Sequence, residues 1–256
     1  MKVVILAGGL GTRLSEETEI KPKPMVEIGG MPILWHIMKI YSHYGYNEFI
    51  ICLGYKGYVI KEFFANYFLH RSDVTINLKK NSVEVHESDA EPWTITLVDT
   101  GVETMTGGRI KRIRKYVGDE TFLLTYGDGL GNINIKNLIS SHKRNKAFCT
   151  LTSVKPQSRF GALSIDNDDK INSFHEKPES EGSYINGGYM ICDKQVFDYI
   201  ENDLTIWEQF SLPKIASEGK LASYKHHGFW LPMDTLNDKY KLNGLWSSNT
   251  AKWKVW

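Results

Sequence analysis

The feature that most constrains the fold is an alternation of buried strands and helices over the first quarter of the chain. Residues 3–6 are continuously apolar and rich in β-branched side chains, which is typical of a strand covered on both faces. A helical pattern begins at Pro32 and stops at Gly45, and both residue types suit those ends. A second buried strand, FIICL, and an aromatic-rich helix over Tyr58–Phe68 follow. This order predicts a parallel sheet with helices on both faces.

The middle of the chain adds strands of another kind. The segments DVTINL, SVEVHE and TITLVDT alternate apolar and polar residues, which predicts strands with one face in solvent. A buried strand then ends at Asp128, and the last helix opens at Asp234–Thr235. We therefore predict one α/β domain over residues 1–256, with a mixed, mostly parallel sheet flanked by helices.

Composition narrows the classes of partner. The formal net charge is only +1, so the protein has no overall field to attract nucleic acid or an anionic membrane, and we expect neither as a partner. The basic run Lys111–Lys115 is interpreted as a solvated helix face. No segment approaches the roughly 20 apolar residues of a membrane span, and the N-terminus lacks a signal-peptide pattern. Because the net charge is close to zero, any binding of an anion must depend on a local group of residues.

The three cysteines are expected to be buried, unreactive thiols. Cys52, Cys149 and Cys192 each lie in an apolar run, and their spacing matches neither a disulfide framework nor a metal site. Free thiols of this kind indicate a reducing compartment, so we expect a cytoplasmic protein.

A glycine-rich turn follows the first strand. Gly8, Gly9 and Gly11 lack Cβ atoms, so successive N–H groups can turn inward toward an anion, although a tight turn without a ligand explains glycines equally well. Leu14 stands where the dinucleotide fingerprint has its third glycine, and no Lys-Ser or Lys-Thr follows the turn as in a kinase-type P-loop. A dinucleotide-dependent oxidoreductase is therefore disfavoured.

Cations next to this turn favour a polyphosphate ligand. Thr12 and Arg13 follow directly, and Lys23 lies between two prolines that fix its direction. Arg13 offers a planar fork of donors and Lys23 a point charge. Lys21 is interpreted as a solvated surface residue, and an ion pair with Glu16 or Glu17 remains the alternative for Arg13.

Two aspartates are candidates for a metal site. Asp128 follows a buried strand between two glycines, and ligands of open α/β sheets bind beyond the carboxyl ends of strands. Mg²⁺ prefers carboxylate, water and phosphate oxygens. An Asp-Gly hairpin turn is the alternative for Asp128, and a helix N-cap is the alternative for Asp234.

Taken in order, these segments resemble one enzyme family, the sugar-1-phosphate nucleotidylyltransferases. The motifs that carry the resemblance are LAGGLGTRL with KPKPM, then YGDG, FHEKP, INGGYM and FWLPMDT. The resemblance implies a Rossmann-like fold of the nucleotide-diphospho-sugar transferase type. With the further segment DTGVETMTGGRIKR, the chain resembles most the family members that transfer a cytidylyl group from CTP to glucose 1-phosphate. This resemblance implies a requirement for Mg²⁺ and a role in O-antigen and lipopolysaccharide synthesis.

The same resemblance assigns roles to individual residues. The implied catalytic residues are Arg13, Lys23 and Asp128, and the implied Mg²⁺ ligands are Asp128 and Asp234. The implied nucleotide site is Leu6, Ala7, Gly8, Gly9, Gly11, Thr12, Arg13, Thr104 and Arg109. The implied sugar-phosphate site is Lys23, Gly127, Glu176, Lys177, Asn186 and Gly187. A homo-oligomer such as a hexamer is also implied.

Several alternatives remain open at this stage. Uridylyl or thymidylyl transfer differs from cytidylyl transfer by one edge of the base, and a non-catalytic nucleotide-sugar sensor would keep the same pocket. Gly107 and Gly108, before a helix expected to start at Arg109, suit an anion at the helix N-terminus. Asn186–Gly188 is either an exposed backbone for a sugar or a bulge, and Trp230 packs either beside the sugar or in the core.

Overall fold

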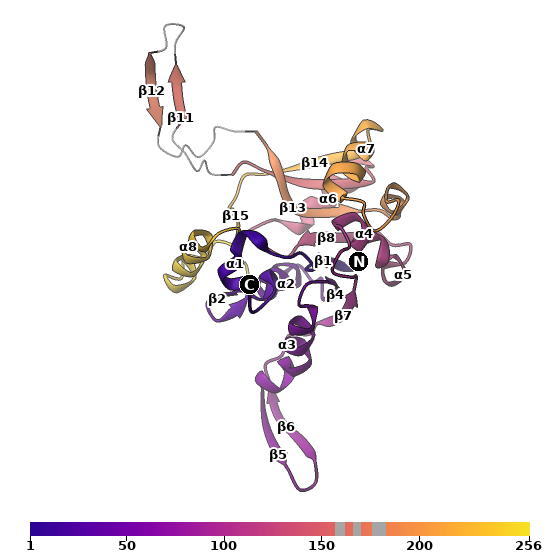
Figure 1. Ribbon diagram of the computed structural model, residues 1–256, viewed down its shortest axis with the longest axis vertical. Coiled ribbons are helices and arrows are strands. Elements are labelled where there is room, and N and C mark those ends of the chain that lie inside the picture. The colour runs from indigo at the N-terminus through magenta and orange to yellow at the C-terminus, as the bar shows by residue number, and fades with distance from the viewer. Residues whose placement is uncertain (157–161, 166–169, 176–182) are drawn as a thin grey trace.

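The centre of the protein, in its computed structural model, is a seven-stranded sheet with strand order β14-β10-β13-β8-β1-β4-β7 (Figure 1). The structure describes residues 1–156, 162–165, 170–175 and 183–256. In chain order the strands are β1 (Val3–Leu6), β4 (Glu48–Leu53), β7 (Thr94–Asp99), β8 (Phe122–Tyr126), β10 (Cys149–Val154), β13 (Ile185–Cys192) and β14 (Leu221–His226).

The sheet is mixed but mostly parallel. β1 pairs in parallel with both β4 and β8, and β4 pairs in parallel with β7. β13 runs antiparallel to β8 and β10, while β10 and β14 are parallel to each other. The predicted fold class is thus confirmed, and parallel pairs need the crossover helices that the sequence pattern indicated.

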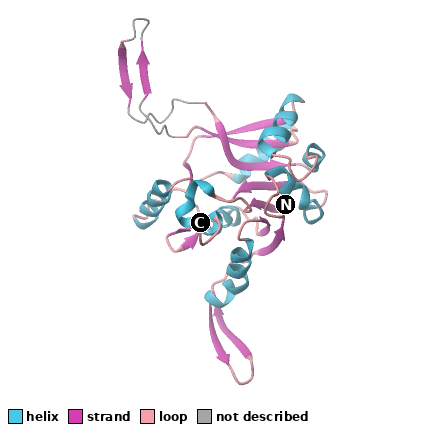
Figure 2. Ribbon diagram, in the orientation of Figure 1, coloured by secondary structure: helices cyan, strands magenta, loops and turns pink. Residues whose placement is uncertain are grey.

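Helices cover both faces of the sheet (Figure 2). One apolar core contains Val3 and Ile5 and packs under α2 (Ile33–His43), α3 (Gly57–His70), α6 (Ile135–Asn145) and α8 (Leu236–Ser247). The other contains Val4 and Leu6 and packs under α4 (Thr106–Arg112), α5 (Arg114–Val117), η3 (Lys194–Tyr199), the π-helical turn η4 (Trp207–Ser211) and α7 (Leu212–Ser217). The side chains of β1 therefore alternate between two buried layers, which explains its continuously apolar sequence.

Small two-stranded sheets extend this body. They are β2 (Glu27–Ile28) with β3 (Met31–Pro32), β5 (Ser72–Asn77) with β6 (Ser82–Ser88), β9 (Gly129–Gly131) with β15 (Trp230–Pro232), and β11 (Ala162–Ile165) with β12 (Ile171–His175). The β5–β6 hairpin projects from one end of the molecule and β11–β12 lies beyond the opposite end (Figure 1). The prediction that β5 and β6 bury one face is wrong for this chain alone, because Ile76 and Val83 are 56% and 52% exposed.

Other local predictions need smaller corrections. Pro32 is the N-cap of α2 rather than its first helical residue, while Gly45 does follow the end of that helix with a φ of +88°. The segment η3, Lys194–Tyr199, is a 3₁₀ helix. None of the helices in the described ranges combines the length and apolar composition needed to cross a membrane.

Candidate active site

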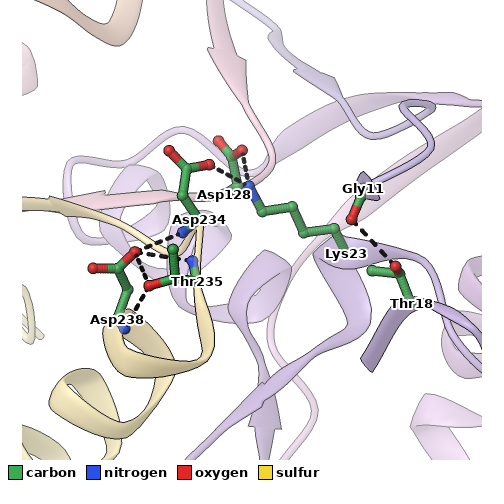
Figure 3. Close-up of polar contacts among 7 residues, drawn as sticks. All are labelled: Gly11, Thr18, Lys23, Asp128, Asp234, Thr235 and Asp238. Carbon is green, nitrogen blue, oxygen red and sulfur yellow. Dashed lines mark hydrogen bonds and ion pairs between the residues drawn. The ribbon is translucent and has the colours of Figure 1, made fainter. Parts of the chain in front are cut away.

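Three of the predicted site residues meet at one ammonium group. Lys23 Nζ lies 2.7 Å from Asp128 Oδ2 and 2.8 Å from Asp234 Oδ1 (Figure 3). Lys23 belongs to the short turn η2 (Lys23–Met25), Asp128 follows β8, and Asp234 precedes α8. Residues far apart in the sequence therefore converge at the carboxyl end of the parallel sheet, where α/β folds bind their ligands.

Backbone pairing explains why the two aspartates meet. β9 follows Asp128 directly and pairs with β15, which ends just before Asp234. Met233 N donates to Asp128 O at 2.8 Å and extends this pairing to the aspartates themselves. Asp128 is therefore not in a simple hairpin turn, which was the alternative interpretation of Asp-Gly.

The electrostatics of the cluster leave an excess of one negative charge. Burial alone lowers the pKa of the Lys23 ammonium, but the charge and hydrogen bonds of Asp128 and Asp234 outweigh burial, so its pKa lies above the ordinary value. Lys23 is therefore protonated at neutral pH and shares its charge between two carboxylates. The side chain of Lys23 is 11% exposed, so solvent screens this pairing only partly.

Asp128 and Asp234 also fit a divalent metal. Mg²⁺ is commonly held in proteins by one or two carboxylates together with phosphate and water oxygens. No group of three or more His, Cys, Asp or Glu residues able to hold a metal occurs in the described part of the chain. The two carboxylates of Asp128 and Asp234, which share one ammonium, are a donor set of the smaller kind.

Asp234 is available for this site because its neighbour caps the helix. Thr235 is the N-cap of α8, and its hydroxyl accepts a hydrogen bond from Asp238 N at 3.2 Å. The Asp238 carboxylate in turn accepts from Thr235 N and Asp234 N, at 2.9 and 3.1 Å (Figure 3). The N-cap interpretation of Asp234 is therefore wrong, and the Thr-x-x-Asp spacing was the signal for Thr235.

The glycines of the first turn have different structural reasons. A Cβ at Gly8 would lie 2.2 Å from Arg109 Nη1, and Gly11 has a φ of +68°. A Cβ at Gly9 would meet nothing within 4 Å. Gly8 and Gly11 are therefore needed by the protein's own packing and conformation, whereas Gly9 presents bare backbone to open space. Leu6 ends β1 beside Tyr126, and Ala7 N donates to Cys52 O at 3.0 Å.

Arg109 lies buried behind this turn. Its guanidinium donates to the carbonyl oxygens of Gly8, Leu53, Gly101 and Val102 and to the Thr100 hydroxyl, at 2.7 to 3.1 Å. These bonds join the first turn, the end of β4 and the loop after β7, so the nearest effect of Arg109 is on the shape of the turn. Thr104 is also buried, with its hydroxyl close to Gly101.

The predicted anion site at the start of the next helix is wrong. α4 begins at Thr106, so Gly107 and Gly108 lie inside the helix and not before it. Their N–H groups donate to Thr205 O, at 2.9 and 3.3 Å, and a Cβ at either glycine would clash with residues 203–205. The glycines permit close packing of α4, and these donors are not free for a ligand.

A pocket beside the cluster collects the candidate sugar residues. Its lining includes Asp128, Asn186, Gly187, Tyr126 and Trp230. Trp230 Nε1 donates to Gly187 O at 2.8 Å, so this aromatic ring forms part of the pocket wall. The pairing of β13 with β10 shifts register near Gly187, so the segment is a bulge and a pocket wall together.

The remaining predicted residues lie in the turns and loops around the lysine cluster or outside the described residues. Gly127 packs against Pro24, and a Cβ there would lie 3.0 Å from the proline ring. Lys21 forms an exposed ion pair with Glu27 at 2.8 Å, as a surface residue would. Thr12 and Arg13 lie in η1 (Thr12–Leu14), but the Arg13 side chain is outside the described part of the structure. Glu176 and Lys177 also lie outside the described residues.

The three cysteines have the state predicted from the sequence. Cys52, Cys149 and Cys192 are free and buried, as predicted, and burial raises the pKa of the Cys52 thiol to about 12.

Tyr126 and Glu208 join the pocket to α4 through hydrogen bonds, and sequence analysis missed both. Glu208 had no motif around it; its proximity arises from the packing of η4 against α4.

Comparison with known proteins agrees with this geometry. A family model described as nucleotidyl transferase matches residues 2–238. The chain is 58% identical over 257 residues to the glucose-1-phosphate cytidylyltransferase of Salmonella typhimurium, with both chains fully covered. It is 48% identical, again with full coverage of both, to a probable glucose-1-phosphate cytidylyltransferase of Bacillus subtilis.

A solved structure with bound ligand extends the comparison. HddC from Yersinia pseudotuberculosis, complexed with GMP-PN, matches with a TM-score of 0.71 and 27% identity, over 96% of this chain and 99% of that chain. The nucleotidyl transferase model matches nearly the whole chain. The same chain has a mostly parallel seven-stranded sheet, a glycine turn and a lysine that bridges two aspartates. The chain therefore belongs to the nucleotidyl transferase family and is a nucleotidyltransferase.

Proposed function

We propose that this protein is a glucose-1-phosphate cytidylyltransferase, which converts CTP and α-D-glucose 1-phosphate into CDP-glucose and pyrophosphate. The full-length identity to relatives with this activity supports the choice of substrates. The structural observation that carries the proposal is the meeting of Lys23, Asp128 and Asp234 beside a pocket lined by Asn186 and Trp230. A cation, two potential metal ligands and a polar recess at one point are what this reaction would need.

The proposed reaction is a single in-line displacement. A phosphate oxygen of glucose 1-phosphate forms a bond to the α-phosphorus of CTP, while the bond from that phosphorus to the bridging oxygen breaks and pyrophosphate leaves with the electron pair. The second pKa of a phosphate monoester is about 6, so the nucleophile is already ionised at neutral pH and needs no general base. The protein's task is to offset repulsion between two polyanions.

The residues divide that task. Lys23 and Arg13 supply fixed positive charge to the phosphates, and the turn with Gly8, Gly9 and Gly11 supplies backbone N–H donors. Asp128 and Asp234 would hold Mg²⁺, which when bound neutralises charge on the phosphate oxygens. The remaining proposed nucleotide contacts are Leu6, Ala7, Thr12, Thr104 and Arg109. The remaining proposed sugar-phosphate contacts are Gly127, Glu176, Lys177, Asn186 and Gly187.

One assay tests the proposed function. The protein is incubated with Mg²⁺, glucose 1-phosphate and each nucleoside triphosphate in turn, and pyrophosphate is measured. We expect release with CTP and not with UTP, dTTP, ATP or GTP. Release with UTP or dTTP alone would assign a different base, and no release with any triphosphate would favour a non-catalytic nucleotide-sugar sensor.

A homo-oligomer, such as a hexamer, is part of the proposal. The β5–β6 hairpin exposes Ile76 and Val83, which pair across the two strands and lie on one face. An exposed apolar face of this kind fits a second copy of the chain. Ile76→Lys should lower the mass measured by light scattering, whereas Thr75→Lys, on the opposite face, should not; equal masses would count against this face.

The proposal also places the reaction in a biosynthetic setting. Three free, buried thiols support a reducing compartment, and we propose the cytoplasm. There the product would serve dideoxyhexose synthesis for O antigen and lipopolysaccharide, as the resemblance to relatives implies.

A further inference from the structure

Glu208 connects the two sides of the proposed site, although it belongs to neither set of predicted residues. It lies on the π-helical turn η4, and π-helical turns are frequent at functional sites. One carboxylate oxygen accepts from the Tyr126 hydroxyl at 2.5 Å, and the other accepts from the Thr106 hydroxyl at 2.7 Å. Tyr126 lines the sugar pocket, whereas Thr106 begins α4, two residues after Thr104.

The chain of hydrogen bonds continues from Tyr126 into the pocket. Asn186 Nδ2 donates to the Tyr126 oxygen at 3.3 Å, and Asn186 Oδ1 accepts from Gly188 N at 2.9 Å. Asn186 itself lines the pocket. Both ends of its side-chain amide are therefore engaged by the protein, and one N–H of the amide remains for a ligand.

Two groups that cannot reverse their roles fix the directions of the bonds in this chain: the Glu208 carboxylate, which accepts, and the Gly188 N–H, which donates. Because the carboxylate can only accept, the Tyr126 hydroxyl must donate to Glu208 and can then only accept from Asn186. Gly188 N holds Asn186 Oδ1, so the NH₂ group of Asn186 lies toward Tyr126, and the Glu208–Tyr126 bond ensures that this group meets an acceptor there.

The tyrosine ring is itself fixed in place. Gly188 has a φ of +80°, and a Cβ there would lie 2.7 Å from Tyr126 Cδ2. The ring therefore packs directly on bare backbone, which leaves its hydroxyl little freedom to turn away from Glu208. On the other side, Trp207 N donates to the Thr106 hydroxyl at 2.9 Å, which leaves that hydroxyl's proton for Glu208.

We propose that Glu208 is a positioning residue that, through Tyr126, holds the Asn186 NH₂ group in place so that its remaining N–H faces the sugar pocket. The inference rests on the proposed function, because it assumes that a sugar phosphate occupies this pocket. The ligand atom at Asn186 must then be a hydrogen-bond acceptor, such as a hydroxyl oxygen of the sugar. Through Thr106, the same carboxylate fastens the start of α4 to the pocket.

The test replaces the carboxylate by an amide of the same shape. In Glu208→Gln the side chain can donate to Tyr126, whose own proton then points at the Asn186 NH₂ group and removes that group's acceptor, while Gly188 N still holds Asn186 Oδ1. We expect the KM for glucose 1-phosphate to rise about tenfold, equivalent to about 1.4 kcal/mol, with kcat and the KM for CTP within about twofold. Tyr126→Phe, which keeps the ring and removes the hydroxyl, should raise the same KM.

A matched control exists directly after α7, at Glu218. The Glu218 carboxylate also accepts a hydrogen bond from a tyrosine, Tyr199, but at an exposed position outside the pocket lining. Glu218→Gln should leave all three kinetic constants unchanged. If Glu208→Gln and Tyr126→Phe also leave the KM for glucose 1-phosphate unchanged, or raise both KM values equally, the inference is overturned.

A second measurement separates this inference from the proposed function. The side-chain NH₂ signals of Asn186 in ¹H–¹⁵N spectra of the free protein should shift in Glu208→Gln and not in Glu218→Gln. This result depends on the hydrogen bonds alone, so it stands even if the wild-type protein releases no pyrophosphate from CTP. Unshifted Asn186 signals in Glu208→Gln would overturn the orienting role, whatever the reaction.

Discussion

At the scale of single residues, the proposed chemistry depends most on one lysine that lies between two aspartates. Lys23 keeps two carboxylates close together that would otherwise repel each other, since both lie within 2.8 Å of its nitrogen. In the proposed reaction, the same ammonium would be available to a phosphate once a metal held the two carboxylates. A neighbouring lysine, Lys21, forms only an exposed surface pair and provides a natural comparison.

Replacing Lys23 by methionine should therefore lower turnover far more than replacing Lys21. We expect Lys23→Met to reduce kcat by roughly 10²–10³-fold, the loss that follows removal of one preorganised charge-stabilising group. Lys21→Met should stay within about twofold, because an exposed ion pair contributes little. Pyrophosphate release measures both. A folded Lys23→Met protein with near-normal kcat contradicts the assigned role.

At the scale of elements, the site depends on how α8 begins. Thr235 caps the helix and Asp238 accepts from the backbone of Thr235 and Asp234, so the cap also fixes the backbone that carries Asp234. α6 has a comparable cap, in which the Asn134 side chain accepts from Asn137 N at 3.0 Å, but Asn134 lies outside the pocket and the lysine cluster.

The two caps predict a separation of stability from activity. Thr235→Ala and Asn134→Ala should each lower the free energy of unfolding by about 1 kcal/mol, the usual value of an N-cap. Only Thr235→Ala should also lower kcat, because it loosens the backbone at Asp234. Denaturant unfolding and pyrophosphate release measure the two effects. Equal activities in both variants would show that the cap does not position Asp234.

Elements were predictable from sequence where local pattern decides the structure. The run Val3–Leu6 and the helical repeat after Pro32 are fixed by burial and periodicity, and both predictions are confirmed apart from the first residue of α2. The start of α4 was misplaced because Gly107 and Gly108 were interpreted as a ligand turn. Their true constraint is a contact with residues 203–205, which lie about a hundred positions away in sequence.

The site was predictable in its residue types but not in its network. Lys23, Asp128 and Asp234 carry recognisable motifs, and the structure brings all three together. Glu208 and Tyr126 carry none, because a hydrogen bond between η4 and β8 exists only once the sheet and α4 have assembled. Burial of the β5–β6 hairpin could not be judged from alternation, since the pattern is the same whether solvent or another chain covers the face.

At the scale of the whole molecule, the C-terminal segment closes one face of the sheet around a buried histidine. His36 on α2 is fully buried and makes edge contacts with the rings of Trp35, Trp246 and Trp253. Its Nε2 lies 2.8 Å from Ile28 O, which makes the neutral ring a donor there. Burial lowers the pKa of His36 to about 4, despite the hydrogen bonds that oppose this shift.

The histidine predicts how stability changes with pH. Unfolded His36 takes up a proton below about pH 6.5, but the folded ring does so only near pH 4, so the free energy of unfolding should fall as pH drops through this window. The total loss is roughly 3 kcal/mol. His36→Gln, which cannot titrate, should weaken this dependence, whereas the exposed His43→Gln should not. An unchanged slope in His36→Gln would contradict the prediction.

The central claim is that Asp128 and Asp234 form one divalent-metal site at which a nucleotide is activated. Its most direct test is the binding of Mn²⁺, as a paramagnetic substitute for Mg²⁺, measured by electron paramagnetic resonance in the presence of CTP. The account predicts tight binding to the wild-type protein and at least about tenfold weaker binding, or 1.4 kcal/mol, to both Asp128→Asn and Asp234→Asn. Wild-type affinity in either folded variant would contradict it.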